Sequence, residues 1–148
     1  EAAALAALSE QARLLVLDTR VGSAVLGGMG TGFTDPAWPR RILFYEALSG
    51  KEVPELAAMV QYVQKSGLDQ RALALMQLGQ PATTPQELAK VKQPVLVAGG
   101  DKDEDNGSGG ALAAMLPAGM HQTVPGDHNS VSRSAPFAAV VLAFLQKH

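Results

Sequence analysis

Residues 94–103 read Pro-Val-Leu-Val-Ala-Gly-Gly-Asp-Lys-Asp, and residues 124–128 read Val-Pro-Gly-Asp-His. The apolar run Pro94–Gly99, bounded by glycine, is typical of a buried parallel strand. Met120–Val124 predicts a second strand. Asp103 and His128 therefore each follow the carboxyl end of a strand, where ligands bind in open α/β sheets. We expect the two loops to bring Asp103 to the His128 ring, although a single histidine after a strand is ordinarily structural.

Strands and helices alternate along the rest of the chain. An apolar run at Val21–Leu26, stopped by glycines, predicts a further parallel strand. At Thr84, a capping residue followed by proline and by Glu87 predicts the start of a short helix. This alternation indicates an α/β protein with a parallel sheet. The expected helices are 2–17, 42–48, 54–65, 68–78, 85–90, 111–116 and 136–146.

Over Pro94–Leu145 the sequence resembles the C-terminal end of an α/β-hydrolase. Gly100-Asp101-Lys102-Asp103 matches the strand end that carries the family's acid, and Pro125-Gly126-Asp127-His128 matches the turn that carries its histidine. The order of acid and histidine along the chain agrees with the family as well. The resemblance implies that Asp103 orients His128 and that His128 is the general base.

The resemblance extends upstream and implies a domain organisation. Residues 1–32 would supply a helix and a strand of the hydrolase core, residues 33–90 a helical cap or lid, and residues 91–148 the C-terminal core. The implied fold class is a partial α/β-hydrolase-like parallel sheet with helices on both faces and a helical cap. Some apolar residues of the cap are expected either to line an acyl pocket or simply to pack between helices: Phe44, Leu48, Met59 and Met76.

The family's nucleophile motif, G-x-S-x-G, has no match in this sequence. Ser9 is the best positional candidate for the nucleophile, but Ala7 and Gln11 stand where the motif has its two glycines. The other interpretation, which the missing glycines favour, is that Ser9 is an ordinary helix residue or helix cap. The family's earlier strands also have no counterpart, so the chain resembles roughly the C-terminal half of a hydrolase.

The resemblance implies a serine hydrolase of the esterase type, with a Ser-Asp-His catalytic triad and an ester or related acyl substrate. It would be an enzyme if the missing half or a partner copy supplies the nucleophile. The alternative is a non-catalytic hydrolase-like fragment or an oligomerising domain. We expect either a fragment or a chain that borrows structure from another copy, because interior strands expose unpaired edges when their neighbours are absent.

Composition excludes several other classes. The 148 residues are 47% hydrophobic and 18% charged, with a net charge of -2, which excludes disorder and argues against nucleic-acid binding. There is no cysteine and no membrane-spanning apolar run, and we expect a cytoplasmic protein. The glycines of 27–32 lack the dinucleotide spacing, and 101–112 lacks the glycine and glutamate positions of a calcium loop. We therefore expect neither a cofactor nor a metal.

Overall fold

Strand β2, Val95–Gly100, is the centre of the sheet, and its apolar residues explain why. Its first four side chains are at most 3% exposed. A strand buried on both faces must be apolar throughout, which is the pattern of a parallel sheet covered by helices. The predicted strand at residues 94–99 is therefore confirmed with a shift of one residue at each end.

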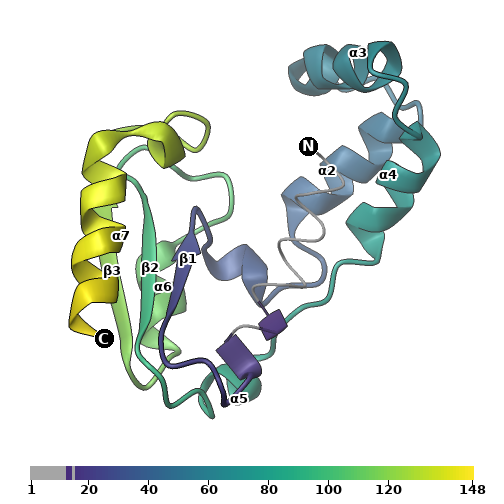
Figure 1. Cartoon of the computed structure of the whole chain (residues 1–148). Coiled ribbons are helices and arrows are strands. Elements are labelled where there is room, and N and C mark those ends of the chain that lie inside the picture. The colour runs from purple at the N-terminus through teal and green to yellow at the C-terminus, as the bar shows by residue number, and fades with distance from the viewer. Residues whose placement is uncertain (1–12, 15) are drawn as a thin grey trace. The chain divides into compact units, whose positions relative to one another are not determined.

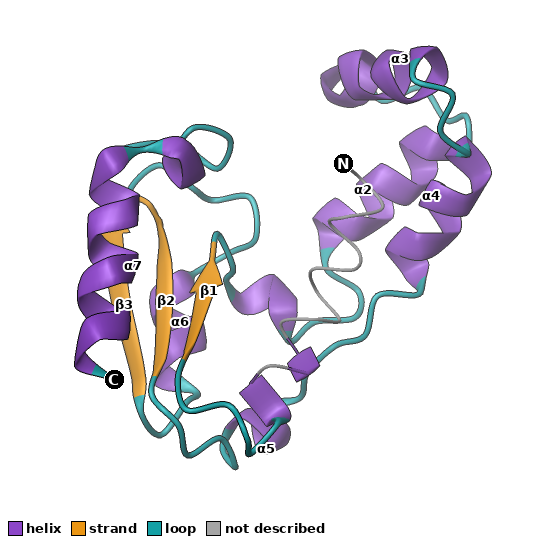
Figure 2. Cartoon of the chain, in the orientation of Figure 1, coloured by secondary structure: helices purple, strands orange, loops and turns teal. Residues whose placement is uncertain are grey.

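The other described strands flank β2 on either side. In this computed structural model, which describes residues 13, 14 and 16–148, the sheet order is β1-β2-β3 and both pairings are parallel. Strand β1 is Ala24–Gly27, with Ala24 opposite Val95, and β3 is Gly119–Val124, with Val124 opposite Gly100. Figures 1 and 2 show the three strands side by side.

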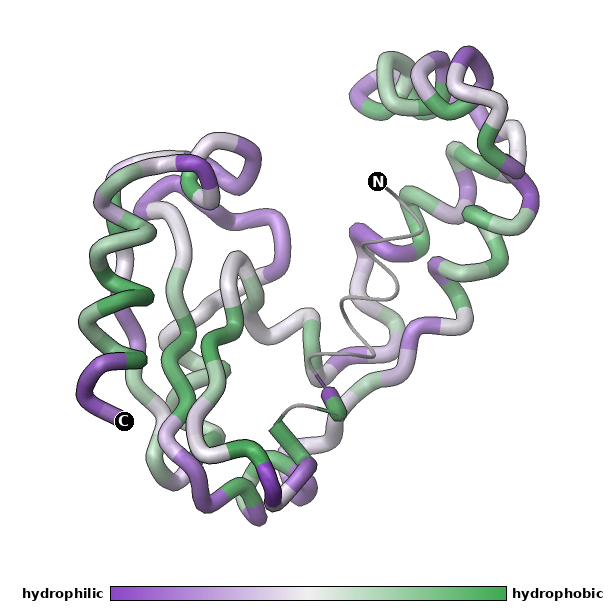
Figure 3. Tube along the Cα trace, in the orientation of Figure 1, coloured by the Kyte–Doolittle hydropathy of each residue, from purple (hydrophilic) through white to green (hydrophobic). Residues whose placement is uncertain are grey.

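Helices cover both faces of this sheet. Helix α6, Gly109–Ala114, places Leu112 in the largest core cluster, together with Leu26 and Val97 from the strands. Helix α7, Ala135–Lys147, packs Phe144 against Leu96 and Ala98 on the other face. The alternation of side chains along a strand accounts for this division, because neighbouring residues point to opposite faces. Figure 3 shows the apolar middle of β2 and of α7 and the hydrophilic loop that follows β2.

The described residues fall into two structural units. The sheet unit holds the described residues up to Asp35 together with Ala82–His148, and the helical unit spans Pro36–Pro81. The first and last segments of the expected domain organisation therefore both contribute to the sheet unit, while the boundaries 1–32, 33–90 and 91–148 stay a prediction. No helix among the described residues is long and apolar enough to span a membrane.

The helical unit is held together by its own apolar contacts. Leu48 and Val63 are buried in one cluster, with Met59 and Met76 packed against it, and Phe44 packs on a second cluster around Val53. These contacts favour the packing interpretation of Phe44, Leu48, Met59 and Met76 over a pocket lining. The unit consists of helix α2 at Pro39–Leu48, the short turn η2 at Pro54–Leu56, α3 at Ala57–Lys65 and α4 at Gln70–Leu78.

The remaining short elements connect the parts of the sheet unit. The predicted capping box is present at helix α5, Pro85–Leu88: Thr84 Oγ1 accepts the Glu87 N–H at 3.2 Å, and Glu87 Oε2 accepts the Thr84 N–H at 2.8 Å. Two turns of 3-10 helix complete the unit, η1 at Thr31–Phe33 and η3 at Val131–Arg133.

Candidate active site

The structure brings Asp103 and His128 into direct contact, as the sequence predicts. His128 Nδ1 lies 2.9 Å from Asp103 Oδ2 and 3.1 Å from Oδ1. The Asp103 side chain is 6% exposed and the His128 side chain 25%. A carboxylate at this position accepts a hydrogen bond from Nδ1–H and so favours the neutral tautomer with its lone pair on Nε2, where it can act as a base. Within the described part of the chain, Nε2 has no hydrogen-bond partner.

The two loops meet because their strands are neighbours that end together. Gly100, the last residue of β2, pairs with Val124, the last residue of β3. The Asp101 N–H donates to the Val124 carbonyl at 2.8 Å, and the Lys102 N–H donates to the Gly126 carbonyl at 3.0 Å. The backbone ladder therefore continues past the strands and carries Asp103 and His128 to the same place.

The side chain of Asp101 adds a further tie between these loops. Its Oδ1 accepts the Gly126 N–H at 2.9 Å. Gly100 makes the crossing feasible, since a Cβ on Gly100 would lie 2.1 Å from the Gly126 carbonyl oxygen. We call residues 101–108, which carry Asp103, the acid loop, and residues 125–130, which carry His128, the histidine loop. Their backbones are in close contact, and only glycine fits at position 100.

The histidine loop is stabilised by its own turn. Asp127 Oδ1 accepts hydrogen bonds from the Ser130 hydroxyl at 2.7 Å, from the Ser130 N–H at 2.9 Å and from the Asn129 N–H at 3.1 Å. These bonds, that of the Ser130 hydroxyl first, hold the pKa of Asp127 below its ordinary value. The charged carboxylate therefore fixes the turn immediately after His128.

The loop after β1 lies directly against the Asp103–His128 pair. Gly28 has φ +63°, and a Cβ placed on it would lie 3.2 Å from His128 Cε1 and 3.5 Å from Asp103 Oδ2. Asn106 holds this loop, because its Nδ2 donates to the Gly28 carbonyl at 2.8 Å. The sequence analysis assigns neither residue to the site: the glycine run at 27–32 indicates a loop after a strand and lacks the dinucleotide spacing, and Asn106 belongs to a run that fails the calcium-loop pattern.

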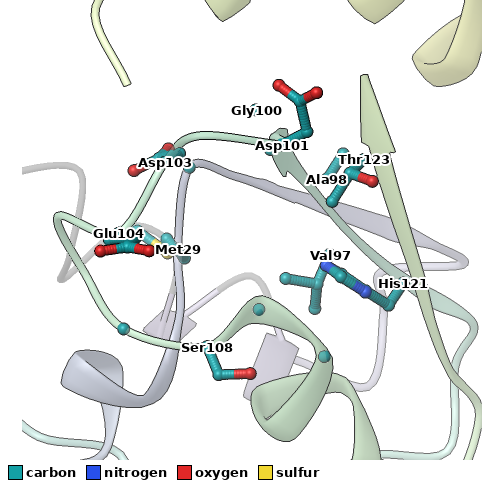
Figure 4. Close-up of a pocket in the computed structure, with 15 residues that line it drawn as sticks. Met29, Val97, Ala98, Gly100, Asp101, Asp103, Glu104, Ser108, His121 and Thr123 are labelled. Carbon is teal, nitrogen blue, oxygen red and sulfur yellow. The ribbon is translucent and has the colours of Figure 1, made fainter. Parts of the chain in front are cut away.

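A pocket of about 390 Å³ lies beside the pair, and Asp103 and Gly28 are among the residues that line it. Figure 4 shows Asp103 and Glu104, from the loop after β2, on one side of the pocket, His121 and Thr123 from β3 on the other, and Ser108 just before α6. Asp103 and Glu104 supply carboxylates, while Met29 and Val97 supply apolar surface. A concave site with mainly apolar walls and a few polar groups is the usual form of a small-molecule site.

One group of side chains has the composition of a metal site. Ligand atoms of Asp103, Asp105 and His128 lie within 4.8 Å of one another, and two carboxylates with an imidazole suit a divalent ion such as zinc. However, the His128–Asp103 hydrogen bond already engages two of the three donors. We therefore interpret the group as a carboxylate–histidine pair with a third carboxylate beside it. Ser9, the nucleophile candidate, lies outside the described residues.

Comparison with known proteins identifies the fold. No protein-family model matches the chain, and no curated protein is significantly similar to it in sequence. Among solved structures, BpoC of Mycobacterium tuberculosis H37Rv, provisionally assigned as a non-heme bromoperoxidase, matches with TM-score 0.61 and 20% identity over 98% of this chain and 71% of its own. The serine hydrolase CarC, involved in carbazole degradation, matches with TM-score 0.59 and 19% identity, over 95% of this chain and 60% of its own.

An enol-lactonase from Burkholderia xenovorans LB400 matches in the same way, with TM-score 0.57 and 14% identity, over 93% of this chain and 62% of its own. At these identities the likeness defines the fold. The described chain therefore has part of an α/β-hydrolase fold, with its parallel strands in one open sheet. It spans 60 to 71% of the length of these three proteins.

Proposed function

We propose that this chain supplies the acid and the base of a serine hydrolase that cleaves esters or related acyl compounds. The hydrogen bond between His128 Nδ1 and Asp103, from a carboxylate that is 6% exposed, is the observation that carries the proposal. A carboxylate so placed fixes the imidazole tautomer and stabilises the imidazolium that forms during the reaction. The names of two fold neighbours, enol-lactonase and serine hydrolase, favour an acyl substrate.

In the proposed reaction, His128 Nε2 takes the proton of a nucleophilic hydroxyl as its oxygen attacks the acyl carbon. The imidazolium then gives that proton to the departing alkoxide, which leaves an acyl-enzyme. Water repeats the cycle: His128 accepts its proton, the acyl group leaves as the acid, and the hydroxyl is regenerated. Asp103 stays ionised throughout and keeps the ring in one orientation.

The nucleophile is Ser9 or a serine supplied by another copy of the chain or by a different chain. Only its position in the sequence supports Ser9 as the nucleophile. A second copy of the chain or a complementing chain would supply the hydroxyl in the other case, and such a partner would be part of the active site.

The second candidate is a hydrolase-like domain without activity of its own. It is favoured by the sequence, which contains no G-x-S-x-G motif. Such a domain would retain the fold and the Asp103–His128 hydrogen bond but would act only by association.

Labelling with a fluorophosphonate probe distinguishes these functions. The probe reacts covalently with a serine that is activated by a neighbouring base. We expect the wild-type chain to be labelled and His128→Ala to lose labelling by at least about 100-fold. Loss in Ser9→Ala as well would identify the nucleophile, whereas labelling that persists would direct a search by peptide mass mapping. A folded wild-type chain that is not labelled at any concentration would support the non-catalytic domain.

A further inference from the structure

Gly28 covers the hydrogen bond between Asp103 and His128. A Cβ on Gly28 would lie 3.3 Å from His128 Nδ1 and 3.5 Å from Asp103 Oδ2, the two atoms that the hydrogen bond joins. The Gly28 main chain therefore lies beside the bond, with no more room than a methyl group would fill between it and the two atoms.

Two hydrogen bonds hold Gly28 there. Its N–H donates to the Ala98 carbonyl at 2.8 Å, which continues the pairing of β1 with β2. Its carbonyl accepts Asn106 Nδ2 at 2.8 Å. The second hydrogen bond comes from a side chain of the acid loop, and it joins that loop to the loop after β1.

Asn106 is well placed to act as such a tie because its own backbone is fixed. The Gly32 N–H donates to the Asn106 carbonyl at 2.9 Å. The two loops are in direct main-chain contact here, since a Cβ on Gly30 would lie 2.6 Å from the Asn106 carbonyl oxygen and 2.2 Å from that of Gly107. The side-chain amide is partly buried, so its bond to Gly28 is shielded from competing water.

We propose that Asn106 is a positioning residue for the Asp103–His128 pair: through Gly28 it holds the loop after β1 against the Nδ1–Oδ2 hydrogen bond and keeps water from that bond. The inference rests on the proposed function for its role in catalysis, although the contact itself does not depend on it. No hydrogen bond joins Asn106 to His128 among the described residues, and Asn106 acts through Gly28.

The hydrogen bond to the Gly28 carbonyl requires a donor group on the side chain of residue 106. An aspartate of the same shape would put a carboxylate oxygen against the Gly28 carbonyl, which places two acceptors together, and a leucine would leave that carbonyl without a partner. Both changes release the loop, but only the first adds a charge. Asn129→Asp supplies the matched control, because it adds the same charge on an exposed residue next to His128 without touching Gly28.

The test uses nitrogen-15 NMR of the histidine rings in the whole chain, at mildly alkaline pH. The rate at which the His128 Nδ1 proton exchanges with water reports how well the bond is covered. We expect this exchange to be at least tenfold slower than that of the exposed His121 ring, and to become at least tenfold faster in Asn106→Asp and Asn106→Leu. In Asn129→Asp it stays within about twofold of wild type.

Equal exchange at His128 and His121 in the wild-type chain would overturn the inference without any variant. Unchanged exchange in a folded Asn106→Leu would overturn it as well, as would an equal acceleration in Asn129→Asp. The proposed function is judged separately by probe labelling. A chain with a protected His128 proton but no labelling would retain the positioning role of Asn106 and lose the hydrolase assignment.

Discussion

His128 Nδ1 and Asp103 Oδ2 lie 2.9 Å apart although the two residues are separated by 25 positions in the sequence. Each residue follows the end of a strand, and the two strands are parallel neighbours in register. The pair is therefore a product of sheet topology. Its consequences can be tested one residue at a time.

Asp103→Asn should retain the fold and change the tautomer of His128. The amide group can donate to Nδ1 and so favours a proton on Nε2, which removes the base. We expect the rate of fluorophosphonate labelling to fall by about 10³- to 10⁴-fold, and nitrogen-15 chemical shifts should place the ring proton on Nε2. A variant that keeps the proton on Nδ1 would contradict the assigned role of Asp103.

Gly28→Ala should disturb the active site as well as the backbone. Gly28 has φ +63°, so an alanine there costs roughly 1–2 kcal/mol of unfolding free energy. Gly67→Ala is the matched control, since Gly67 has φ +71° and nothing lies within 4 Å of its added Cβ. Denaturant unfolding should show a loss in both variants, whereas only Gly28→Ala should shift the His128 ring signals. Equal ring shifts in both would show that strain alone explains the effect.

Gly100→Ala should separate the acid loop from the histidine loop. The added methyl group would meet the Gly126 carbonyl oxygen at 2.1 Å, which only a backbone movement can relieve. We expect a loss of about 3 kcal/mol in unfolding free energy. Gly22→Ala meets nothing within 4 Å and should change stability by less than about 0.5 kcal/mol. Similar unfolding midpoints for the two variants would refute the close crossing.

The histidine loop should lose its order in acid. Hydrogen bonds from Ser130 and then Asn129 lower the pKa of Asp127 from its ordinary value of 3.8. A lowered native pKa means that the carboxylate stabilises the loop above that ordinary value, and that this support disappears as the pH falls through the native pKa. The amide signals of Asn129 and Ser130 should report this loss. In Asp127→Asn the same signals should show no such step on acidification, and a step of equal size there would assign it to another group.

Much of the site could be predicted from the sequence because local patterns define it. The apolar run before Asp103 and the turn before His128 each indicate a strand end, and parallel neighbours bring such ends together. The capping box at Thr84 and Glu87 was equally readable, since it depends on two residues three positions apart.

The remaining features depend on tertiary contacts. Strand β1 was predicted over 21–26 but begins at Ala24, because pairing starts opposite Val95. Helix α2 begins at Pro39 instead of residue 42, since proline is favoured in the first turn of a helix. The Asn106–Gly28 tie joins loops from different strands, and no spacing in the sequence indicates it.

The pairing of Ala24 with Val95 also has a consequence for how the chain tolerates change. The whole helical unit is inserted between these two adjacent strands, so it is a loop from the standpoint of the sheet. The entropy of closing a loop grows only logarithmically, and doubling its length costs about 0.6 kcal/mol. Helices can therefore be added to the helical unit or removed from it with little loss of sheet stability. The sequence of the helical unit is then free to change while the strands that hold Asp103 and His128 stay the same.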